Sequence, residues 1–416
     1  MAVTVSYSPA QKLYPAGQYL IYTLDEASTP DRYIVEVYRS TSTTTIGTLL
    51  SKVYLTPNNS GKVHYDLSAI AEGVMRPPLS SGGESIHSHQ TASKIFQADE
   101  LTVAMFTLRF GQYNGTTETL NEVEKKVYIG NGVEQITSGL LPSFVEYYPT
   151  SNNRIGWLTD RKRSDPEDDT SEIQVSMAEE DQAVGLIYIT DNLGTATSVT
   201  RCRVRQYNTS GTFVAYIDIA IPSISATIAR QSLLAVPIGP AHWSHLGLNA
   251  ACHTAKFRLE TSSGGDKCVE LAVTKDHPRP CNHDATQVAW LNTRGGWDYL
   301  RFDSRSPLNV NVTGKTFRKQ VGTYGSSTFS LSTQMNQYET YAKTGKEAYT
   351  LSENFFSAEE RDLLQYLMRS KVVQMRRGTG TWEPVVVRSN SLTIEPAGSR
   401  FYNVSLDVEL GRDVRC

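Results

Sequence analysis

The densest group of chemically capable side chains in the sequence is Cys281-Asn-His-Asp284, with His277 close upstream. Thiolate, imidazole and carboxylate groups are the ligands that Zn²⁺ prefers in proteins. The run lacks the paired Cys-x-x-Cys or spaced histidines of recognisable structural zinc sites, so it leaves open whether Cys281 and His283 bind a metal. The same two side chains could form a nucleophilic pair only with partners from elsewhere in the chain.

A second pair of candidate ligands is formed by His87 and His89. If this segment is extended, side chains at alternate positions point the same way and could share a metal ion. No third ligand lies beside them, and a solvated loop over Ser80–Ser93 is the simpler interpretation. We therefore expect no metal site and no cofactor.

Three tryptophans, Trp157, Trp243 and Trp382, are candidates for an aromatic binding surface. Exposed aromatic rings on β-sandwiches commonly stack on sugars, because the rings offer a large apolar area beside a polar rim. They would carry a carbohydrate-binding function, for which exposed rings beside Asp or Asn in a groove are expected.

The charged groups suggest neither a catalytic centre nor a nucleic-acid site. Glu179–Asp181 and Asp165–Asp169 belong to charge runs that usually face solvent, and the basic pairs at Arg318 and Arg376 are too small for a nucleic-acid groove. The sequence contains no phosphate-binding loop, dinucleotide fingerprint or serine-hydrolase elbow. We expect a protein that is not an enzyme.

Composition narrows the class further. The chain has 416 residues, a formal net charge of −3, and 22 Tyr, 12 Phe and 5 Trp, so it has ample core material and no global attraction to nucleic acid. It contains no run of about 18 apolar residues and no basic, apolar leader, so we expect neither a membrane span nor a signal peptide. Five widely spaced cysteines argue against a disulfide framework and favour reduced thiols in a protein made in the cytoplasm.

The elements that would position these residues are mainly β-strands. Short alternating runs separated by Ser, Gly, Asn and Pro clusters predict two tandem immunoglobulin-like or fibronectin-like β-sandwiches, over residues 1–142 and 143–283. One of these runs places Tyr33, Val35 and Val37 on a single face. The strands expected in the two blocks are Asp31–Arg39, Lys52–Leu55, Leu101–Phe110, Glu124–Ile129, Leu186–Thr190, Thr200–Tyr207, Thr212–Ile221 and Thr254–Glu260. A brief helix is expected from Asp66 or Ser68 to the proline pair at Pro77.

The third block, 284–416, opens with a hairpin in which Gln287–Leu291 and Trp297–Phe302 flank a turn with two glycines. Its helix, 357–370, begins with the capping box Ser357-Ala-Glu-Glu360 and carries one apolar stripe. The last strand, Tyr402–Leu410, alternates strictly and so has one wet face. Further strands are expected over Lys315–Tyr324, Ser327–Met335, Ala348–Leu351, Lys371–Met375, Trp382–Val387 and Ser391–Ile394.

This third block resembles the C-terminal parts of minor tail and baseplate proteins of tailed bacteriophages, most of all the distal-tail and tail-tube-like group. The resemblance lies in Phe356–Met368, Trp382–Val387 and Tyr402–Leu410. The Trp290–Phe302 hairpin and Asn58–Ser68 are similar to virion proteins of phages and prophages of the Bacteroidetes group. The resemblance implies a tail-tube-like β domain with one packed helix and carries no catalytic residues.

The leading interpretation is therefore a structural virion protein of the tail, baseplate or collar, made in the bacterial host cytoplasm. It would assemble as a homo-oligomeric ring with neighbouring tail proteins, and a host surface glycan is a further candidate partner. Neither a membrane nor a specific nucleic acid is expected as a partner. Two alternatives remain: a carbohydrate-binding or adhesion protein, and a metal-assisted hydrolase built on Cys281–Asp284.

Overall fold

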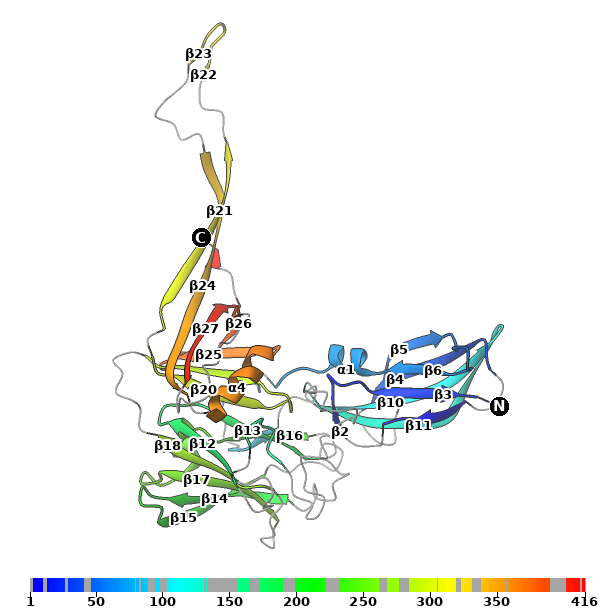
Figure 1. Ribbon diagram of the computed structural model, residues 1–416, viewed down its shortest axis with the longest axis horizontal. Helices are drawn as coiled ribbons and strands as arrows, with labels where there is room; N and C mark the ends of the chain where they lie inside the picture. The colour runs from blue at the N-terminus through cyan, green and yellow to red at the C-terminus, as the bar shows by residue number, and fades with distance from the viewer. Residues whose placement is uncertain are drawn as a thin grey trace. The chain divides into compact units, whose positions relative to one another are not determined.

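The computed structural model shows a mainly β protein built from several β-sandwich sheets (Figure 1). The chain clusters into two compact units: Met1–Arg279 with Ala289–Tyr299, and Pro280–Val288 with Leu300–Cys416. The structure describes residues 3–9, 13–26, 29–40, 46–78, 80–81, 84–88, 94–97, 103–130, 132, 156–162, 164, 172–189, 199–221, 232–261, 268–276, 284–304, 306–318, 323–330, 338–356, 358–389, 402–411 and 414–415.

The first sandwich lies in the N-terminal part of the first unit. Its sheets have the orders β1-β3-β6 and β2-β11-β10-β4-β5. The strands are β1 (Thr4–Tyr7), β2 (Leu13–Pro15), β3 (Ile21–Asp25), β4 (Arg32–Ser40), β5 (Thr48–Leu55), β6 (Val63–Asp66), β10 (Val103–Asn114) and β11 (Thr117–Gly130). Tyr33, Val35 and Val37 share one buried core, as their alternation predicts.

A short helix, α1 (Ser68–Val74), follows β6 as expected, although it ends before the proline pair. Asp66 organises its start, because Asp66 Oδ1 accepts hydrogen bonds from Ser68 N and Leu20 N, each at 3.0 Å. One short pair comes next in the chain, β7 (Ser80–Ser81) with β8 (Glu84–Ser85), and the short strand β9 (Phe96–Gln97) follows it.

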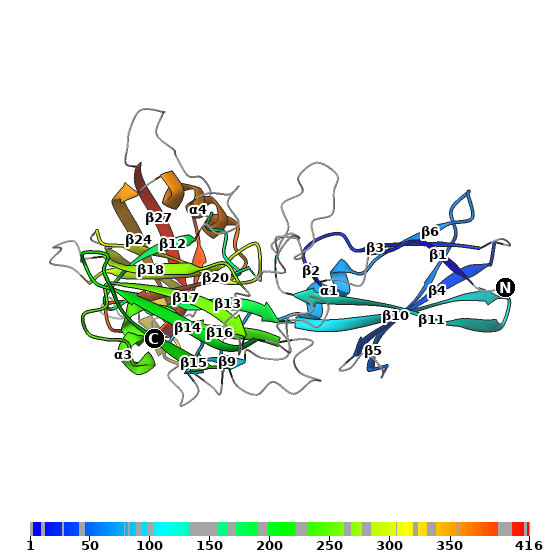
Figure 2. The same ribbon diagram turned by 90° about the horizontal axis from the view of Figure 1, so that it is seen from below.

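The second sandwich also belongs to the first unit, and its sheets have the orders β12-β18-β17-β14-β15 and β13-β16-β9 (Figure 2). The new elements are β12 (Ile173–Ala178), β13 (Val184–Ile189), β14 (Val199–Tyr207), β15 (Phe213–Ala220), β16 (Ser232–Pro237), η3 (Pro240–His242), α3 (Trp243–Leu246), β17 (Thr254–Thr261) and β18 (Leu271–Asp276). β12 pairs with β18 in parallel, whereas β14 pairs with both β15 and β17 antiparallel. The four strands expected here from alternation are confirmed.

The domain boundaries differ in part from those expected. The boundary near residue 142 lies outside the described residues, and β9, from the first expected domain, pairs with β16 of the second. Ala289–Tyr299, expected to open a third domain, clusters with the first unit. The first difference comes from strand pairing between distant segments. The second comes with hydrogen bonds that join Ala289–Tyr299 to the first unit, from Asn292 Nδ2 to Leu158 O and from Trp297 Nε1 to Pro78 O.

A further large sheet is ordered β20-β19-β25-β26-β27-β24-β21, with β28 also paired to β24, and all of it except Ala289–Tyr299 belongs to the second unit. The elements in this part of the chain are β19 (Thr286–Leu291), β20 (Trp297–Phe302), β21 (Leu308–Arg318), β22 (Thr323–Tyr324), β23 (Phe329–Ser330), β24 (Tyr338–Phe356), α4 (Ala358–Arg369), β25 (Val373–Arg377), β26 (Glu383–Val387), β27 (Tyr402–Leu410) and β28 (Val414–Arg415).

α4 buries Leu363, Leu364 and Leu367, as its stripe predicts, and alternate side chains of β27 are buried from Val404 to Leu410. Ser357 of the expected capping box and the strand Ser391–Ile394 lie outside the described residues.

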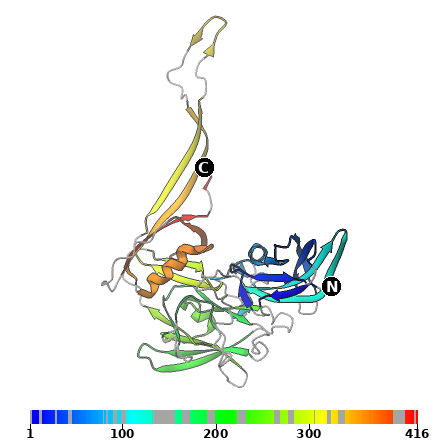
Figure 3. The ribbon, with the colours of Figure 1, turned by 45° about the vertical axis from the view of Figure 1, so that its right-hand side comes forward.

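The strands β21 and β24 form a two-stranded ribbon that extends beyond the rest of this sheet (Figures 1 and 3). The sequence predicts strands in this region over Lys315–Tyr324 and Ser327–Met335. The structure differs, because the ribbon is formed by β21 and by the single 19-residue strand β24. β24 pairs with β21 from Tyr338 to Tyr349 and with β27 from Ala348 to Phe356. One continuous strand therefore belongs both to the packed sheet and to the ribbon.

The same turn chemistry recurs at Asn58, Asn208 and Asn292. In each turn the Asn Oδ1 accepts hydrogen bonds from the backbone N of the second and fourth residues that follow, at 2.9–3.1 Å. The third following residue is a glycine with φ between 74° and 83°, a region that other residues rarely adopt. Asn-x-x-Gly thus forms three reversals of the chain, although Asn311-Val-Thr-Gly314 has the same pattern within the strand β21.

Replacing Asn208 by Ala tests the importance of this turn chemistry. The variant loses the acceptor for Ser210 N, Ser210 Oγ and Thr212 N, so we expect the free energy of unfolding to fall by about 1–2 kcal/mol. Thr209→Ala in the same turn is the control and should cost less than about 0.5 kcal/mol. Equal losses for the two variants in urea unfolding would contradict the assignment.

Candidate functional site

Two of the three tryptophans expected at a binding surface are core residues. Trp157 is 1% exposed and donates from Nε1 to Val269 O at 2.9 Å, and Trp243 is 3% exposed and donates to Ile238 O at 3.0 Å. The prediction of a sugar-stacking surface is therefore wrong for these two, because a ring must be exposed to stack on a ligand. Trp382 is half-buried.

His87 is also buried and does not lie in a solvated loop. Its Nδ1 lies 2.8 Å from Tyr299 Oη, and its backbone carbonyl lies 2.8 Å from His242 Nε2. The imidazole packs edge-on against the rings of Trp297 and Tyr299, with centroids 4.7 and 5.5 Å away. His87 thus fastens its segment to the aromatic hairpin β19–β20.

The other expected metal ligands, His89, His277, Cys281 and His283, lie outside the described residues. Within the part of the chain that is described, no group of three or more His, Cys, Asp and Glu side chains is arranged to hold a metal ion. Cys202, Cys252 and Cys268 are buried and not in disulfides. Burial raises the pKa of the Cys252 thiol to about 11, so this thiol stays protonated and weakly nucleophilic at neutral pH.

A largely buried polar site joins the turn after β19 to the segment after Trp157. We call its five residues the turn staple: Thr159, Asp160, Asn292, Thr293 and Asp298. Asp298 accepts hydrogen bonds from Thr159 Oγ1, from Asp160 N at 2.8 Å and from Asn292 Nδ2 at 3.1 Å. Asp160 in turn accepts from Thr293 N at 3.0 Å and from Thr293 Oγ1. Each carboxylate therefore belongs to one segment and bonds to the other.

Close packing at Gly296 completes this join. A Cβ at Gly296 would lie 1.9 Å from Leu158 O, so only glycine lets the turn approach this segment. Asn292 Nδ2 also donates to Leu158 O at 2.8 Å. The Asn292 side chain thus shapes the turn through its Oδ1 and binds the turn to Leu158 through its Nδ2.

Burial of two carboxyl groups at close range changes their acidity. Loss of solvation and the nearby Asp298 raise the pKa of Asp160 to about 6, although the bonds from Thr293 and the charge of Arg294 oppose the rise. Burial also raises the pKa of Asp298, against the opposing effect of Arg161 and the bonds that Asp298 accepts. A proton bound by either carboxyl group relieves the repulsion of two like charges.

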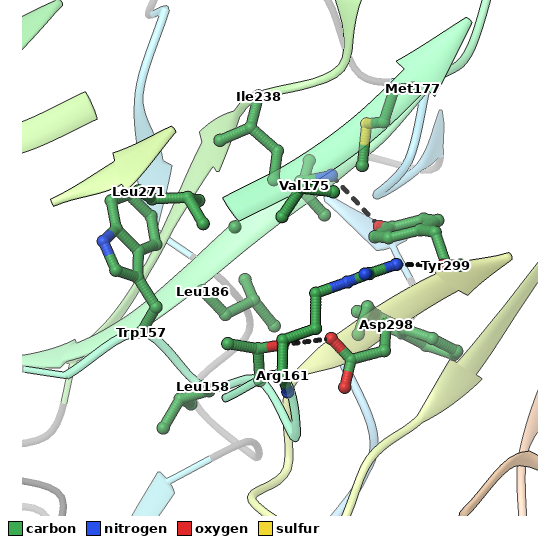
Figure 4. Close-up of a pocket in the computed structure, with 14 residues that line it drawn as sticks. Trp157, Leu158, Arg161, Val175, Met177, Leu186, Ile238, Leu271, Asp298 and Tyr299 are labelled. Atoms are coloured by element: carbon green, nitrogen blue, oxygen red, sulfur yellow. Dashed lines mark hydrogen bonds between the residues drawn. The ribbon is translucent and has the colours of Figure 1, made fainter. Parts of the chain in front are cut away.

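A cavity of about 20 Å³ adjoins the staple, between Trp157, Arg161, Val175 and Tyr299 (Figure 4). This volume accommodates about one water molecule. Arg161 crosses its wall and donates from Nη2 to Tyr299 O at 2.9 Å, and Val184 N donates to Tyr299 Oη at 3.0 Å. The carboxylates thus join two segments of the chain beside a cavity of about the size of one water molecule.

The ribbon of the second unit is exposed to solvent, whereas the turn staple is largely buried. All 11 residues of β21 are exposed, although Leu308, Val310 and Val312 alternate with polar residues as in a half-buried strand. Val310 is 56% and Val312 58% exposed. Further along the ribbon, Phe317 and Tyr341 pack against each other at 6.1 Å while both remain exposed. The alternation was visible in the sequence, but whether anything covers its apolar face was not.

Comparisons with known proteins give no family. No protein-family model matches the chain, and no curated protein matches it. Solved structures with some similarity include fibronectin(III)-like modules of Clostridium thermocellum CbhA, with 9% identity, 68% of this chain and 97% of that chain covered, and a TM-score of 0.17. Another is a complex of Dpr2 Ig1-Ig2 with DIP-Theta Ig1-Ig3, with 8% identity, 99% and 90% coverage, and a TM-score of 0.18. Scores this low say nothing about function.

Among the described helices, none is both long and apolar enough to cross a membrane.

The turn staple predicts a pH-dependent stability. Aspartate in an unfolded chain titrates near 4, so a raised pKa means that the folded protein binds the proton more tightly. The free energy of unfolding should therefore fall as the pH rises through about 6, by roughly 1–2 kcal/mol between pH 5 and 7. Asp160→Asn should flatten this slope in urea unfolding, whereas Glu179→Gln on the surface should leave it unchanged. A wild-type slope of opposite sign that Asp160→Asn leaves intact would refute the assignment.

Replacing Gly296 by Ala tests the close approach of the turn. The new methyl group would overlap the Leu158 carbonyl, so we expect a loss of roughly 2–4 kcal/mol in the free energy of unfolding. Gly115→Ala is a control at a turn glycine with φ of 61° and open space around its Cα, and it should cost only about 1 kcal/mol. Similar melting temperatures for the two variants would show that the staple tolerates separation.

Proposed function

We propose that this chain is a structural subunit of a tailed-bacteriophage virion, in the tail, baseplate or collar. It acts by assembly with copies of itself and with neighbouring virion proteins, and not by catalysis. The single observation that carries the proposal is the β21–β24 ribbon. The resemblance of Phe356–Met368, Trp382–Val387 and Tyr402–Leu410 to phage tail and baseplate proteins supports the same function.

The ribbon has open hydrogen-bonding edges. Among the described strands β21 pairs only with β24, so its outer edge is unpaired along Leu308–Arg318. Within the described part of the chain, β24 has no second neighbour from Tyr338 to Lys343. Unpaired strand edges add strands from other chains readily, and natural proteins usually cover or shorten them. A long open edge is therefore expected to be covered in an assembly.

The ribbon also exposes apolar side chains that have no core of their own. Leu308, Val310 and Val312 lie at alternate positions on one face of β21. Burying a Leu or Val side chain fully stabilises by about 1.5–3 kcal/mol, so covering the half-exposed row contributes on the order of 3 kcal/mol per copy. A ring closes when such a contact is repeated head to tail around an axis.

The two alternative functions have less structural support. The carbohydrate-binding alternative rests on Trp157, Trp243 and Trp382, and the first two are buried. The metal-assisted hydrolase rested on Cys281–Asp284, of which only Asp284 is described. Stoichiometric metal in the purified protein would revive the hydrolase.

The double variant Val310→Lys, Val312→Lys tests assembly through the ribbon. Charged side chains in the apolar row should raise the dissociation constant of the oligomer at least tenfold, because they must be desolvated at the interface. Light scattering over a concentration series, with electron micrographs of the same samples, measures the effect. The melting temperature of the monomer should not change, since the row is already exposed.

Thr313→Lys is the matched control, because Thr313 lies on the other face of β21 and is equally exposed. It should leave the oligomer intact. A wild-type protein that stays monomeric, both alone and when mixed with the other structural proteins of its virion, would overturn the proposed function.

A further inference from the structure

A separate surface with binding chemistry lies on the outer face of the sheet β12-β18-β17-β14-β15. We call it the Arg205 face, after its central residue. The inward side chains of β14, Cys202, Val204 and Gln206, are buried, so Arg203, Arg205 and Tyr207 point outward. In the strand register Arg205 stands between Lys256 of β17 and Tyr216 of β15, and β14 lies between these two strands (Figure 2).

The cations around Arg205 are all engaged in ion pairs. Glu260, which is almost fully buried, pairs with Arg201 at 3.2 Å, Arg203 at 3.1 Å and Arg258 at 3.3 Å. Asp218 pairs with Arg203 at 2.8 Å and with Arg201 at 3.3 Å. On the other side of Arg205, Lys256 pairs with Glu172 at 2.5 Å and with Glu270 at 3.5 Å.

Arg205 is the exception on this face. Among the described residues its guanidinium has no hydrogen bond and no ion pair, although it is half-buried. Among the described residues the face thus holds five cations and four carboxylates, and Arg205 is the cation without a carboxylate partner. A guanidinium in this position is available for a planar, bidentate bond to a carboxylate from outside.

Aromatic side chains lie beside Arg205 in the strand register, with Tyr216 opposite it on β15 and Tyr207 two residues further along β14. Tyr216 is 55% and Phe213 51% exposed, and Phe213 packs edge-on against Tyr207 at 5.9 Å. Arg203 stacks on the ring of Tyr216 at 4.5 Å, and Lys256 lies 5.4 Å from the ring of Tyr207. These contacts hold the rings in place before any ligand arrives, which lowers the entropy lost on binding.

We propose that the Arg205 face binds a carboxylate-bearing sugar of an acidic polysaccharide. The sugar carboxylate bonds to the guanidinium of Arg205, while its ring and its neighbours lie over Tyr216, Tyr207 and Phe213. Aromatic side chains offer apolar area with a polar tip, which suits a ligand that has both apolar and hydroxyl-rich faces. This site lies outside the β21–β24 ribbon and does not depend on the assembly function.

The distribution of charge favours a glycan over a nucleic acid. A single-stranded nucleic acid carries a phosphate at every nucleotide and is bound in grooves with many unneutralised cations. Four carboxylates on this face would repel successive phosphates, whereas one free guanidinium matches one carboxylate on an otherwise neutral sugar. Hydroxyl groups of the sugar are compatible with nearby carboxylates because they can donate hydrogen bonds to them.

The test is binding of the full-length protein to an array of acidic oligosaccharides: oligogalacturonate, alginate oligomers, hyaluronan hexasaccharide and sialyllactose. Each is printed beside its methyl ester, which keeps the sugar but removes the charge. At least one acid should bind, its ester should bind at least tenfold more weakly, and the affinity follows by calorimetry. Arg205→Gln should weaken binding of that acid at least tenfold, and Tyr216→Ala should weaken it severalfold.

Arg32→Gln, at an exposed arginine on β4 of the other sandwich, is the matched control and should bind like the wild type. Circular dichroism and the melting temperature establish that each variant is folded. The proposal is overturned if no acidic glycan binds at millimolar concentration, if acid and ester bind equally, or if Arg205→Gln binds normally. Tighter binding of a 20-mer of oligothymidylate than of any glycan would overturn it in favour of a nucleic-acid surface.

Discussion

The need to satisfy a fully buried carboxylate, Asp298, organises the centre of the first unit. An ionised carboxylate removed from water costs several kcal/mol unless nearby donors replace its hydration. Here Thr159, Asp160 and Asn292 provide those donors from two segments that are far apart in the chain. The hairpin turn and the segment after Trp157 must therefore meet for either to be stable. The same requirement explains the glycine at position 296, since any larger residue would separate them.

The aromatic hairpin β19–β20 extends this organisation outward from the turn. Trp297 donates to Pro78 O at 2.9 Å, and Tyr299 contacts His87 and Val184 through its hydroxyl. Burial raises the pKa of the Tyr299 hydroxyl well above its usual value, so at neutral pH it remains a neutral group that can both donate and accept. Segments from three distant parts of the sequence are thereby joined at one hairpin.

The ribbon of the second unit, unlike the turn staple, is not covered by other described segments of the chain. Its backbone bonds are satisfied within the hairpin, but its side chains have no facing layer among the described residues. A sheet normally gains its stability by burying one face against another layer. In the turn staple, polar side chains bond to one another inside the first unit. The ribbon instead leaves an apolar row and strand edges accessible, and this accessibility is the basis of the proposed assembly.

Much of the local structure follows from the sequence alone. Alternation identified β4, β14, β17 and β27, because side chains of a strand point to opposite faces at a fixed period of two. The apolar stripe identified α4, and Asn-x-x-Gly coincides with three turns whose hydrogen bonds close within five residues. All of these depend on interactions between neighbours in the chain. The predicted ends of several strands nevertheless differ by a few residues.

The tertiary structure alone decided what those elements face. The sequence around Trp157, Trp243 and His87 suggests surface or binding-site residues. All three are buried, because other parts of the chain pack over them. Asp160 and Asp298 are 138 positions apart and carry no motif, so their pairing could not be read from spacing. The reverse holds for Val310 and Val312, whose alternation is that of a core strand although they remain exposed. Sequence periodicity reports which side chains share a face, because that depends on backbone geometry, but burial depends on which other part of the chain packs against that face.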